Sequence, residues 1–487
     1  MHTLQLKLNT TASDRKELEK RFRMMNKCHN VLVKHAINML HGLERNPEYR
    51  TLKERYCTLL RKEKLSKAEN AEKRALSKQM TQVRNEMGCS EYGLINYIKP
   101  WGKRNGRCLQ SQPIQVEASR VWHGVERVLF GNGEQLHFKK LEDMTTIGGK
   151  SNLNGVRFDK EPMAVKYNGL IMPVKLSNNP KDRSYVKKSL DSKIKYCELK
   201  RMMFPNGWHY YVIIVMDDDA PKKLSCPENG TGGVDIGTST VAVVTDNQAV
   251  LEELAPAVNE YNRRITKLQR SLDRSKRAAN PNKYNEDGTI KKGNRDKWVY
   301  SKNYRKKRRQ LRSLFRQKSA YIKQSHERLC NHLLRDTNTY YVEQMNFAGL
   351  AKRAKTTKRP NGKKKRFGKS LNNRAPASFV ATLKRKCEQY GGWVHKVNTR
   401  VFKASQFHHD TGEYIRHSLS ERTKTIEGYT VQRDLYSAFL LKNSDPDGLS
   451  PMIEQCNKTF ESFLDLQDSL VVSMRLNGIS NKACFGF

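Results

Sequence analysis

The sequence contains no long hydrophobic run. Hydrophobic residues make up 37% of its 487 residues, and no uninterrupted apolar stretch reaches the roughly 18 residues needed to cross a bilayer. The N-terminal segment, MHTLQLKLNTTASDRKELEKRF, has no apolar run after a basic start, unlike a signal peptide. We therefore expect a cytoplasmic protein with no membrane partner.

Closely spaced cysteine pairs are also absent. No Cys-x-x-Cys occurs, and the ten cysteines are scattered over positions 28, 57, 89, 108, 197, 226, 330, 387, 456 and 484. Structural zinc sites built from cysteine normally use close pairs. Without a secretion signal, the pattern predicts free thiols in a reducing compartment and no structural zinc held by cysteine.

Acidic residues are few compared with basic ones. The chain has 49 Asp and Glu against 92 Lys and Arg, which gives a net charge of +43. A protein this basic needs a polyanion to offset its self-repulsion. An anionic membrane surface would also do so, but no lipidation signal or basic amphipathic anchor is present. Nucleic acid is the expected partner.

The first half of the chain divides into helical and β-rich segments. Residues 2–9 alternate between apolar and polar positions, which predicts a first strand within residues 1–15. Charged, helix-periodic sequence fills 16–119, and short apolar runs separated by turn signals make 120–225 β-rich. Because the helical segment separates the two like an insertion, we expect the first strand to join the later sheet.

Two basic stretches in the second half predict nucleic-acid contacts. The first lies in a long helical region, 257–336, that a loop at 280–294 interrupts. The second is the loop 351–370, which is poor in apolar residues. The residues predicted to bind nucleic acid are Arg305, Lys306, Arg308, Arg309, Arg312, Lys363, Lys364, Lys365 and Arg366.

Three isolated acids lie outside any charge run. Asp235 lies in the strand-like GGVDIGTSTVAVV, Glu343 near the end of the strand TYYVEQM, and Asp434 at the start of a helix in VQRDLYSAF. Burying a carboxylate is costly unless a cation pairs with it or binds it. Each acid alone could be a satisfied structural residue. Together, in a basic protein, they predict a two-metal site.

The expected cofactor is Mg²⁺, as two ions held by these three acids. Phosphodiester hydrolysis needs charge neutralisation at the phosphate and a water deprotonated near neutral pH. Two Mg²⁺ ions about 3.5–4 Å apart supply both. Mg²⁺ prefers oxygen ligands and keeps several waters, so three carboxylates suffice.

Four motifs in order resemble a known family. GVDIGTSTVAVV, YYVEQMNFAGLAKR, NNRAPASF and VQRDLYSAF are similar to motifs in the RuvC nuclease domain of TnpB and of the type V CRISPR effectors descended from it. The resemblance is strongest over residues 230–440. It implies that Asp235, Glu343 and Asp434 take the positions of the family's three catalytic acids.

The resemblance also implies a fold and partners. It implies an α+β multidomain protein with an RNase H-like (RuvC) nuclease domain at 226–487, a β-barrel-like wedge domain at 1–15 and 120–225, and a helical recognition domain at 16–119. The family carries a guide RNA, recognises a short target-adjacent motif and cuts target double-stranded DNA with one RuvC site. Such a protein works in the prokaryotic cytoplasm, near the nucleoid. Its oligomeric state and guide source stay open.

One departure from the family concerns zinc. The family usually has a four-cysteine zinc module between the second and third acids, but the segment 399–430 has no cysteine. Adjacent histidines rarely converge on one ion, so we do not expect a substitute site from His408, His409 and Asp410. We expect a degenerate target-nucleic-acid-binding insert without metal, packed on Phe407, Tyr414 and Ile426.

Two other functions are compatible with parts of this pattern. A catalytically silent RNA-guided DNA-binding repressor would share the basic surfaces, but the intact set of three acids argues against it. A transposase or Holliday-junction resolvase of RNase H-like fold would share the acids. The large N-terminal region and the VQRDLYSAF motif disfavour a small resolvase, and no His-hydrophobe-His pair suits a tyrosine transposase.

Overall fold

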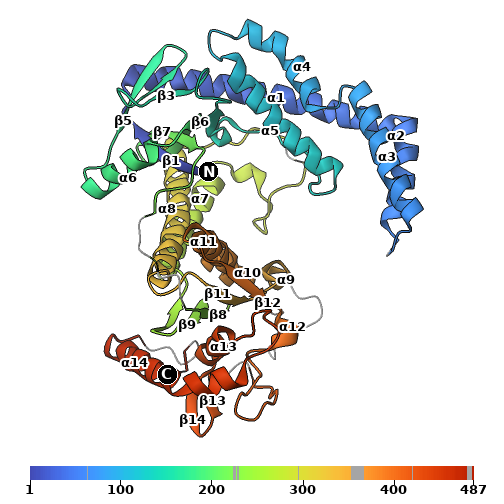
Figure 1. Ribbon diagram of the computed structural model, residues 1–487. Coiled ribbons are helices and arrows are strands. Elements are labelled where there is room, and N and C mark those ends of the chain that lie inside the picture. Colours follow the sequence, from blue (N-terminus) through green and yellow to red (C-terminus); the bar gives the residue numbers. More distant parts are fainter. Residues whose placement is uncertain are drawn as a thin grey trace. The chain divides into compact units, whose positions relative to one another are not determined.

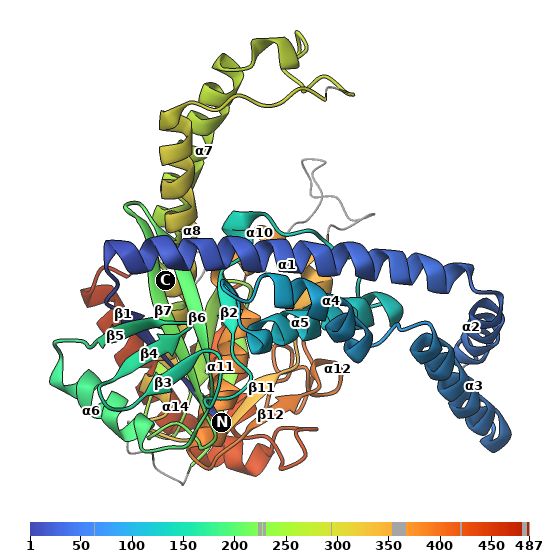
Figure 2. The ribbon, with the colours of Figure 1, turned by 90° about the horizontal axis from the view of Figure 1, so that it is seen from above.

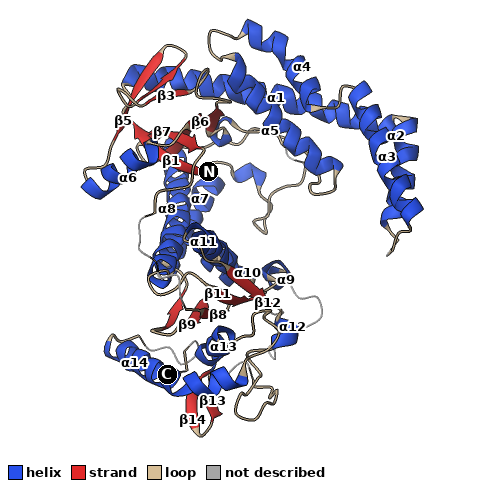
Figure 3. Cartoon of the chain, viewed as in Figure 1, coloured by secondary structure: helices blue, strands red, loops and turns tan. Residues whose placement is uncertain are grey.

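The computed structural model describes residues 1–62, 64–222, 226, 230–293, 295–352, 367–418, 421–479 and 485–486. The chain divides into two compact units, Met1–Pro221 and Lys222–Phe487, which are described separately. Both units combine helices with sheets (Figure 3), so the expected α+β multidomain class is confirmed. Within the described residues, no helix is long and apolar enough to span a bilayer.

The first unit combines a group of helices with one antiparallel sheet (Figure 1). The strands are β1 (His2–Leu8), β2 (Thr146–Gly148), β3 (Arg157–Asp159), β4 (Ala164–Tyr167), β5 (Leu170–Lys175), β6 (Ile194–Phe204) and β7 (Gly207–Met216). The helices are α1 (Ala12–Arg45), α2 (Pro47–Leu60), α3 (Lys67–Glu86), α4 (Glu91–Arg104), α5 (Ser111–Leu129), α6 (Pro180–Leu190) and the 3-10 turn η1 (Leu141–Asp143).

The N-terminal strand lies inside this sheet. The strand order is β2-β6-β7-β1-β5-β4-β3, and β1 pairs with β7 through Leu4 and Ile214 and with β5 through Lys7 and Lys175. Its alternate residues Leu4, Leu6 and Leu8 are buried in the core. The expectation that the first strand joins the later β-rich segment is confirmed.

The helical part extends beyond its predicted limits on both sides. It begins at α1, where Thr11 and Asp14 form a capping box, rather than at residue 16. It ends at Leu129 of α5 rather than at residue 119. The predicted boundary at 119 was wrong because the buried helical stripe continues through Ile114, Ala118, Val121 and Val125.

Asn152 links two strands that lie far apart in the strand order, β6 and β3. The backbone N–H of Asn152 donates to the carbonyl of Lys195 on β6 (3.2 Å). The Asn152 side chain accepts from the N–H of Phe158 on β3 (2.8 Å) and donates to its carbonyl (3.0 Å). The sheet therefore curls. Its assignment as a wedge domain stays a prediction.

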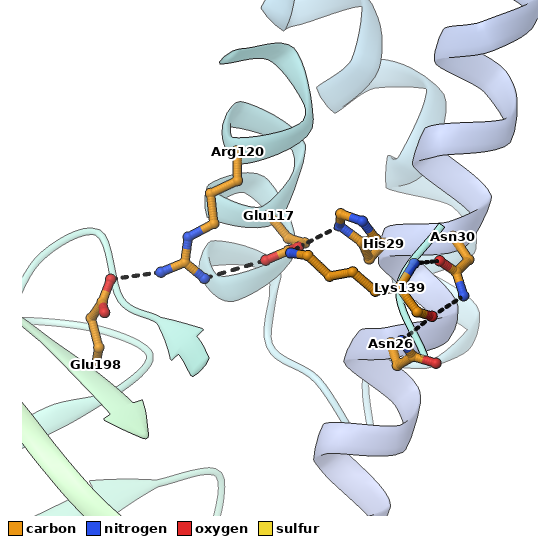
Figure 4. A network of polar contacts seen from close by, with 7 residues as sticks. All are labelled: Asn26, His29, Asn30, Glu117, Arg120, Lys139 and Glu198. Atoms are coloured by element: carbon orange, nitrogen blue, oxygen red, sulfur yellow. Dashed lines mark hydrogen bonds and ion pairs between the residues drawn. The ribbon is translucent and has the colours of Figure 1, made fainter. Parts of the chain in front are cut away.

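A buried carboxylate ties the helices to the sheet (Figure 4). Glu117 on α5 is 1% exposed and accepts hydrogen bonds from His29 Nδ1 on α1 (2.7 Å), Lys139 Nζ (3.3 Å) and Arg120 Nη1 (3.3 Å). Arg120 also donates to Glu198 on β6 (2.6 Å). Burial alone would raise the pKa of Glu117, but the bond from His29 and the charges of Lys139 and Arg120 outweigh burial and lower it.

Replacing Glu117 is expected to destabilise the first unit. Glu117→Ala leaves His29 buried without its partner and removes the link between α1, α5 and β6. Breaking a buried ionic network by deleting one member costs about 3 kcal/mol or more. For a unit of this size, that should lower the melting temperature by about 6–12 °C, measured calorimetrically on the full chain.

Two controls separate this effect from a general loss of charge. Glu126→Ala removes an exposed carboxylate on the same helix and should leave the melting temperature nearly unchanged. Because the pKa of Glu117 is lowered on folding, its contribution is present above the usual glutamate pKa and is lost as pH falls below it. A Glu117→Ala deficit that persists undiminished in acid would contradict an ionic role.

The second unit is built around a mixed sheet with helices on both faces. Its strands are β8 (Gly232–Ile236), β9 (Thr240–Val244), β10 (Ala249–Glu253), β11 (Tyr340–Glu343) and β12 (Val394–Val397), with a hairpin of β13 (Thr423–Ile426) and β14 (Tyr429–Gln432). Its helices are α7 (Val258–Ala278), the 3-10 turn η2 (Pro281–Lys283), α8 (Lys302–Leu333), α9 (Phe347–Ala351), α10 (Gly368–Arg374), α11 (Pro376–Gln389), α12 (Thr399–Phe402), α13 (Arg433–Lys442) and α14 (Ile453–Leu476).

The five-stranded sheet separates two hydrophobic cores. Its order is β10-β9-β8-β11-β12, in which β8, β9 and β10 are antiparallel and β11 runs parallel to β8 and β12. Val234 and Ile236 of β8 share a core with Leu329 of α8 and Phe379 of α11. The opposite face packs on α13 and α14, through residues that include Ala242, Val244, Tyr341, Leu435 and Phe463.

Helices α7 and α8 pack side by side as an arm (Figure 2). The residues that join them were predicted to form a loop at 280–294, and part of this segment is compact. Lys283 is buried and donates to the carbonyls of Asp296 (2.7 Å) and Lys297 (2.8 Å). Lys276 and Lys283 lie against the ring of Trp298 at 4.0 and 4.9 Å. The arm therefore ends in a folded tip.

Candidate active site

Asp235 and Glu343 lie side by side at the ends of two adjacent parallel strands. Strand β8 pairs with β11 so that Val234 faces Val342, and each acid is the next residue on its strand. Successive side chains on a strand point to opposite faces. Since Val234 and Val342 share one core, both acids point to the other face, which α13 and α14 cover.

Helix α13 carries the third acid to the same face. Asp434 lies in its first turn, and the helix packs against β8 and β9. A Cβ at Gly233 would collide with the carbonyl oxygen of Ala438, so only glycine fits there. Ser437 and Ala438 of α13 are small and fully buried, which lets this helix approach the sheet closely.

The three carboxylates line a common cavity of about 520 Å³. The loop between β8 and β9, Met345 after β11, and residues of the 399–433 region form most of the rest of its wall. The cations among the lining residues are Lys403, Arg416, Arg422 and Arg433. The cavity therefore combines a carboxylate cluster with positive charge, an arrangement suited to a cation and a phosphate.

Two of the carboxylates in this cavity, Asp235 and Glu343, are poorly compensated. Burial, followed by the charges of Asp434 and Glu343, raises the pKa of Asp235 well above its usual value, although Arg433 and Arg422 oppose the shift. Burial raises the pKa of Glu343 to about 7. A bound cation would stabilise the ionised form of both groups. The chemistry of the donor set therefore fits a hard metal ion.

Asp434 differs from the other two acids because arginines face both of its oxygens. Arg433 donates to Oδ1 through Nε (3.2 Å) and Nη2 (3.0 Å), and Arg422 Nη1 lies 3.7 Å from Oδ2. The guanidinium of Arg433 is itself held by the carbonyls of Ser418 (3.3 Å) and Glu421 (2.8 Å). The orientation of Asp434 is therefore tied to the segment that precedes β13.

The three carboxylates of this cavity do not surround one point closely enough to hold a single metal ion. Among the described residues, no three His, Cys, Asp or Glu side chains come close enough together to hold one metal ion. Two ions shared between pairs of carboxylates would not need all three acids around one point, and water completes the coordination of Mg²⁺. The metal-binding role of the acids stays a prediction.

Sequence reasoning missed a further, buried basic residue near the acids. Lys424 on β13 is 4% exposed, and its Nζ has no hydrogen-bond partner. Burial, together with the charge of Arg433, lowers its pKa to about 8, while Asp235 opposes that shift. Lys424 follows the alternating pattern of β13, but nothing in the sequence relates that strand to Asp235.

The predicted insert contains aromatic packing at its centre. Phe407 and Ile426 are buried, and the Phe407 ring contacts that of the half-exposed Tyr414, with centroids 5.1 Å apart. His408 and His409 point to different partners. His408 Nε2 lies 3.1 Å from Nε2 of His417, and His409 Nδ1 lies 2.8 Å from the hydroxyl of Tyr436.

We expect purified protein to contain well below one zinc per chain. The expectation rests on the missing cysteines and on the separate partners of His408 and His409. Elemental analysis measures it directly. Removing a structural zinc would lower the melting temperature, because such an ion stabilises its module strongly. Since we expect no structural zinc, a chelator should leave the melting temperature unchanged. One zinc per chain would contradict this prediction and would identify His408 and His417 as the first ligands to replace.

The predicted nucleic-acid residues on α8 differ in exposure. Arg305, Lys306 and Arg309 are exposed, whereas Arg308 and Arg312 are partly buried. Lys307 of the same run instead donates to Ser271 of α7 (2.7 Å). Four further predicted contacts lie outside the described residues, namely Lys363, Lys364, Lys365 and Arg366. Nucleic-acid binding by either group stays a prediction.

Comparison with known proteins gives structural matches only. No family model and no curated protein matches the sequence. The cryo-EM structure of a Cas12f1–sgRNA–target DNA complex matches over 91% of this chain and 98% of that chain, with a TM-score of 0.43 and 12% identity. A CRISPR–Cas12f ternary complex matches over 92% and 99%, with a TM-score of 0.28 and 15% identity. The function is therefore derived from the site itself.

Proposed function

We propose that the protein is an RNA-guided DNA endonuclease with a single RuvC-type site, and that its partners are a guide RNA and target double-stranded DNA. The observation that carries the proposal is the convergence of Asp235, Glu343 and Asp434 on one face of a mixed sheet, in one cavity that also contains cations. The sheet order supports an RNase H-like nuclease domain. The four ordered motifs and the net charge of +43 support the guide RNA.

The residues of the cavity have distinct roles in this proposal. Asp235, Glu343 and Asp434 hold Mg²⁺, which when bound neutralises phosphate charge and lowers the pKa of a water. Lys403 and Arg416 attract the phosphodiester backbone to the cavity. Arg433 orients Asp434 through its paired hydrogen bonds. The first unit supplies the wedge and recognition surfaces, and 399–430 contacts the target nucleic acid.

A catalytically silent RNA-guided DNA-binding protein is the second candidate. One observation favours it, since Asp434 is paired with Arg433 and Arg422 as a structural acid would be. A cleavage assay separates the two. The protein purified with its RNA should cut a matched plasmid in Mg²⁺ and leave it intact in EDTA. Tight guided binding without any cutting would favour the silent protein.

A further inference from the structure

A second cavity of the second unit lies at the carboxyl ends of two adjacent parallel strands, β11 and β12 (Figure 1). Glu343, the last residue of β11, is in register with Val397, the last residue of β12. The N–H of Gln344 donates to the carbonyl of Val397 (2.8 Å). The segments that follow the two strands therefore leave the sheet side by side. Open sheets bind ligands in such a crevice, outside the carboxyl ends of their strands.

This cavity, which we call the amide cavity, adjoins the carboxylate cavity. It has a volume of about 760 Å³ and is lined by residues from 344–350 and 398–400. Met345 and Thr399 line both cavities. A nucleic-acid strand with one phosphate at the three acids would therefore have a neighbouring phosphate within reach of the amide cavity.

Two asparagines of the amide cavity present hydrogen-bond donors to it. Asn346 Oδ1 accepts from the N–H of Gly349 (2.8 Å), and Asn398 Oδ1 accepts from the N–H of Arg400 (3.0 Å). A backbone N–H can only donate, so it fixes which side-chain atom is the oxygen, and each Nδ2 group remains as a donor. Both asparagines are exposed, so a ligand can reach them.

The charge of the amide cavity also favours an anion. Arg400 is exposed and lines it with a guanidinium group, which has donors and no acceptor. Among the described residues that line the cavity, none is acidic. A metal cation is disfavoured here, because the amide oxygens of Asn346 and Asn398 already accept from the backbone. Guanidinium and amide N–H groups are instead common partners of phosphate oxygens.

We propose that the amide cavity binds the phosphate next to the scissile one, on the strand that the carboxylate cavity cuts. Arg400 pairs with the oxygens of this phosphate, and Asn346 and Asn398 donate to them. Met345, which lines both cavities, packs against the sugar between the two phosphates. The second phosphate does not react, but holding it fixes the position of the one that does. This inference rests on the proposed nuclease function.

Methylphosphonate linkages test the proposal, because each replaces a charged phosphate oxygen by a methyl group. The full chain, purified with its RNA, first cuts an unmodified target so that the cut position can be mapped. Single methylphosphonates are then placed at the linkages on either side of the cut, and the single-turnover cleavage rate is measured below saturation. We expect one of these two linkages to lower the rate about tenfold, as the loss of a hydrogen-bonded charge would.

Matched variants assign the effect to the amide cavity. Arg400→Gln should cut the unmodified target about tenfold more slowly, but should add little on the sensitive methylphosphonate strand, because both changes remove the same contact. Lys458→Gln is the control. It removes an exposed charge on α14 outside both cavities and should leave the methylphosphonate effect unchanged.

An asparagine variant separates the donor from the structural role. Asn398→Asp keeps an oxygen for the N–H of Arg400, since Asp and Asn cap helices about equally well. It replaces the Nδ2 donor by a negatively charged oxygen, which repels phosphate. The variant should keep the melting temperature and cut the unmodified target about tenfold more slowly, with a smaller deficit on the sensitive methylphosphonate strand. A merely structural role would give the same deficit on both strands.

The unmutated chain already provides a decisive outcome. Equal cleavage of the unmodified strand and of both methylphosphonate strands would overturn the phosphate site and leave the nuclease function standing. A methylphosphonate effect that persists undiminished in Arg400→Gln and Asn398→Asp would also overturn it, because the contact would then lie elsewhere. If the unmodified target were never cut, the proposed function itself would be wrong, and this inference with it.

Discussion

Asp235→Ala is expected to abolish cleavage of a matched plasmid and to leave guided DNA binding intact. Affinity comes from base pairing and from many Lys and Arg contacts to phosphate, and one carboxylate contributes little to either. Cleavage depends instead on the ligands of the metal site. Asp235 lies on β8, the central strand of the five-stranded sheet. Its loss should reduce the cleavage rate by about three orders of magnitude or more. Removing its charge should not weaken binding, since a free carboxylate repels the DNA backbone.

The matched variants make this result specific. Glu343→Ala and Asp434→Ala should behave like Asp235→Ala, and combining them should add little, because residues of one site act as a unit. Glu461→Ala is the control. Glu461 is an exposed acid on α14 and does not line the carboxylate cavity. Its loss should leave cleavage nearly unchanged.

Three other outcomes would have different meanings. Cleavage by Asp235→Ala at close to the unmutated rate would show that Asp235 is structural and that the nuclease proposal is wrong. Loss of both cleavage and binding would indicate collapse of the fold, which Asp235→Asn tests because it keeps the size of the side chain. Guided binding without cleavage by the unmutated chain would favour the silent protein, with Asp434 held permanently by its arginines.

The strands that carry the acids could be predicted because their residues follow simple local rules. GVDI and YYVE are local strand-forming runs, and in each the acid directly follows a core valine, Val234 or Val342. Ser437 and Ala438 of α13 are small, and Gly233 on β8 leaves room for that helix to pack closely on the sheet. These features depend on a few neighbouring side chains, so the sequence alone contains them.

The remaining features depend on residues far apart in the chain. The pairing of Asp434 with Arg422, the approach of Lys424 to Asp235, and the bond between His29 and Glu117 all arise when separate elements pack together. Packing in the core also decides where α5 ends, because its buried face continues past residue 119 through Val121 and Val125. The compact tip of the arm depends on the burial of Lys283, a residue type that composition places at the surface.

Neutralising the exposed cations of α8 is expected to reduce the salt dependence of nucleic-acid binding. From Lys302 to Lys318 the helix contains basic residues and no acid, and Arg305, Lys306 and Arg309 are exposed. Each phosphate contact releases a counterion. Replacing all three by glutamine should therefore reduce the slope of log affinity against log salt by about 2–3 units. Fluorescence anisotropy of RNA binding over a salt series measures the slope.

A charge-conserving variant tests whether charge rather than shape is responsible. Arg305→Lys, Lys306→Arg and Arg309→Lys together keep the three positive charges and should keep the slope of the unmutated chain, because counterion release depends on charge. These three side chains lie outside the contacts that join the arm, such as that of Lys307 with Ser271, so neither variant should unfold it. An unchanged slope in the glutamine variant would mean that this face of α8 is solvated in the complex. The polyanion that offsets the net charge of +43 would then bind elsewhere on the chain.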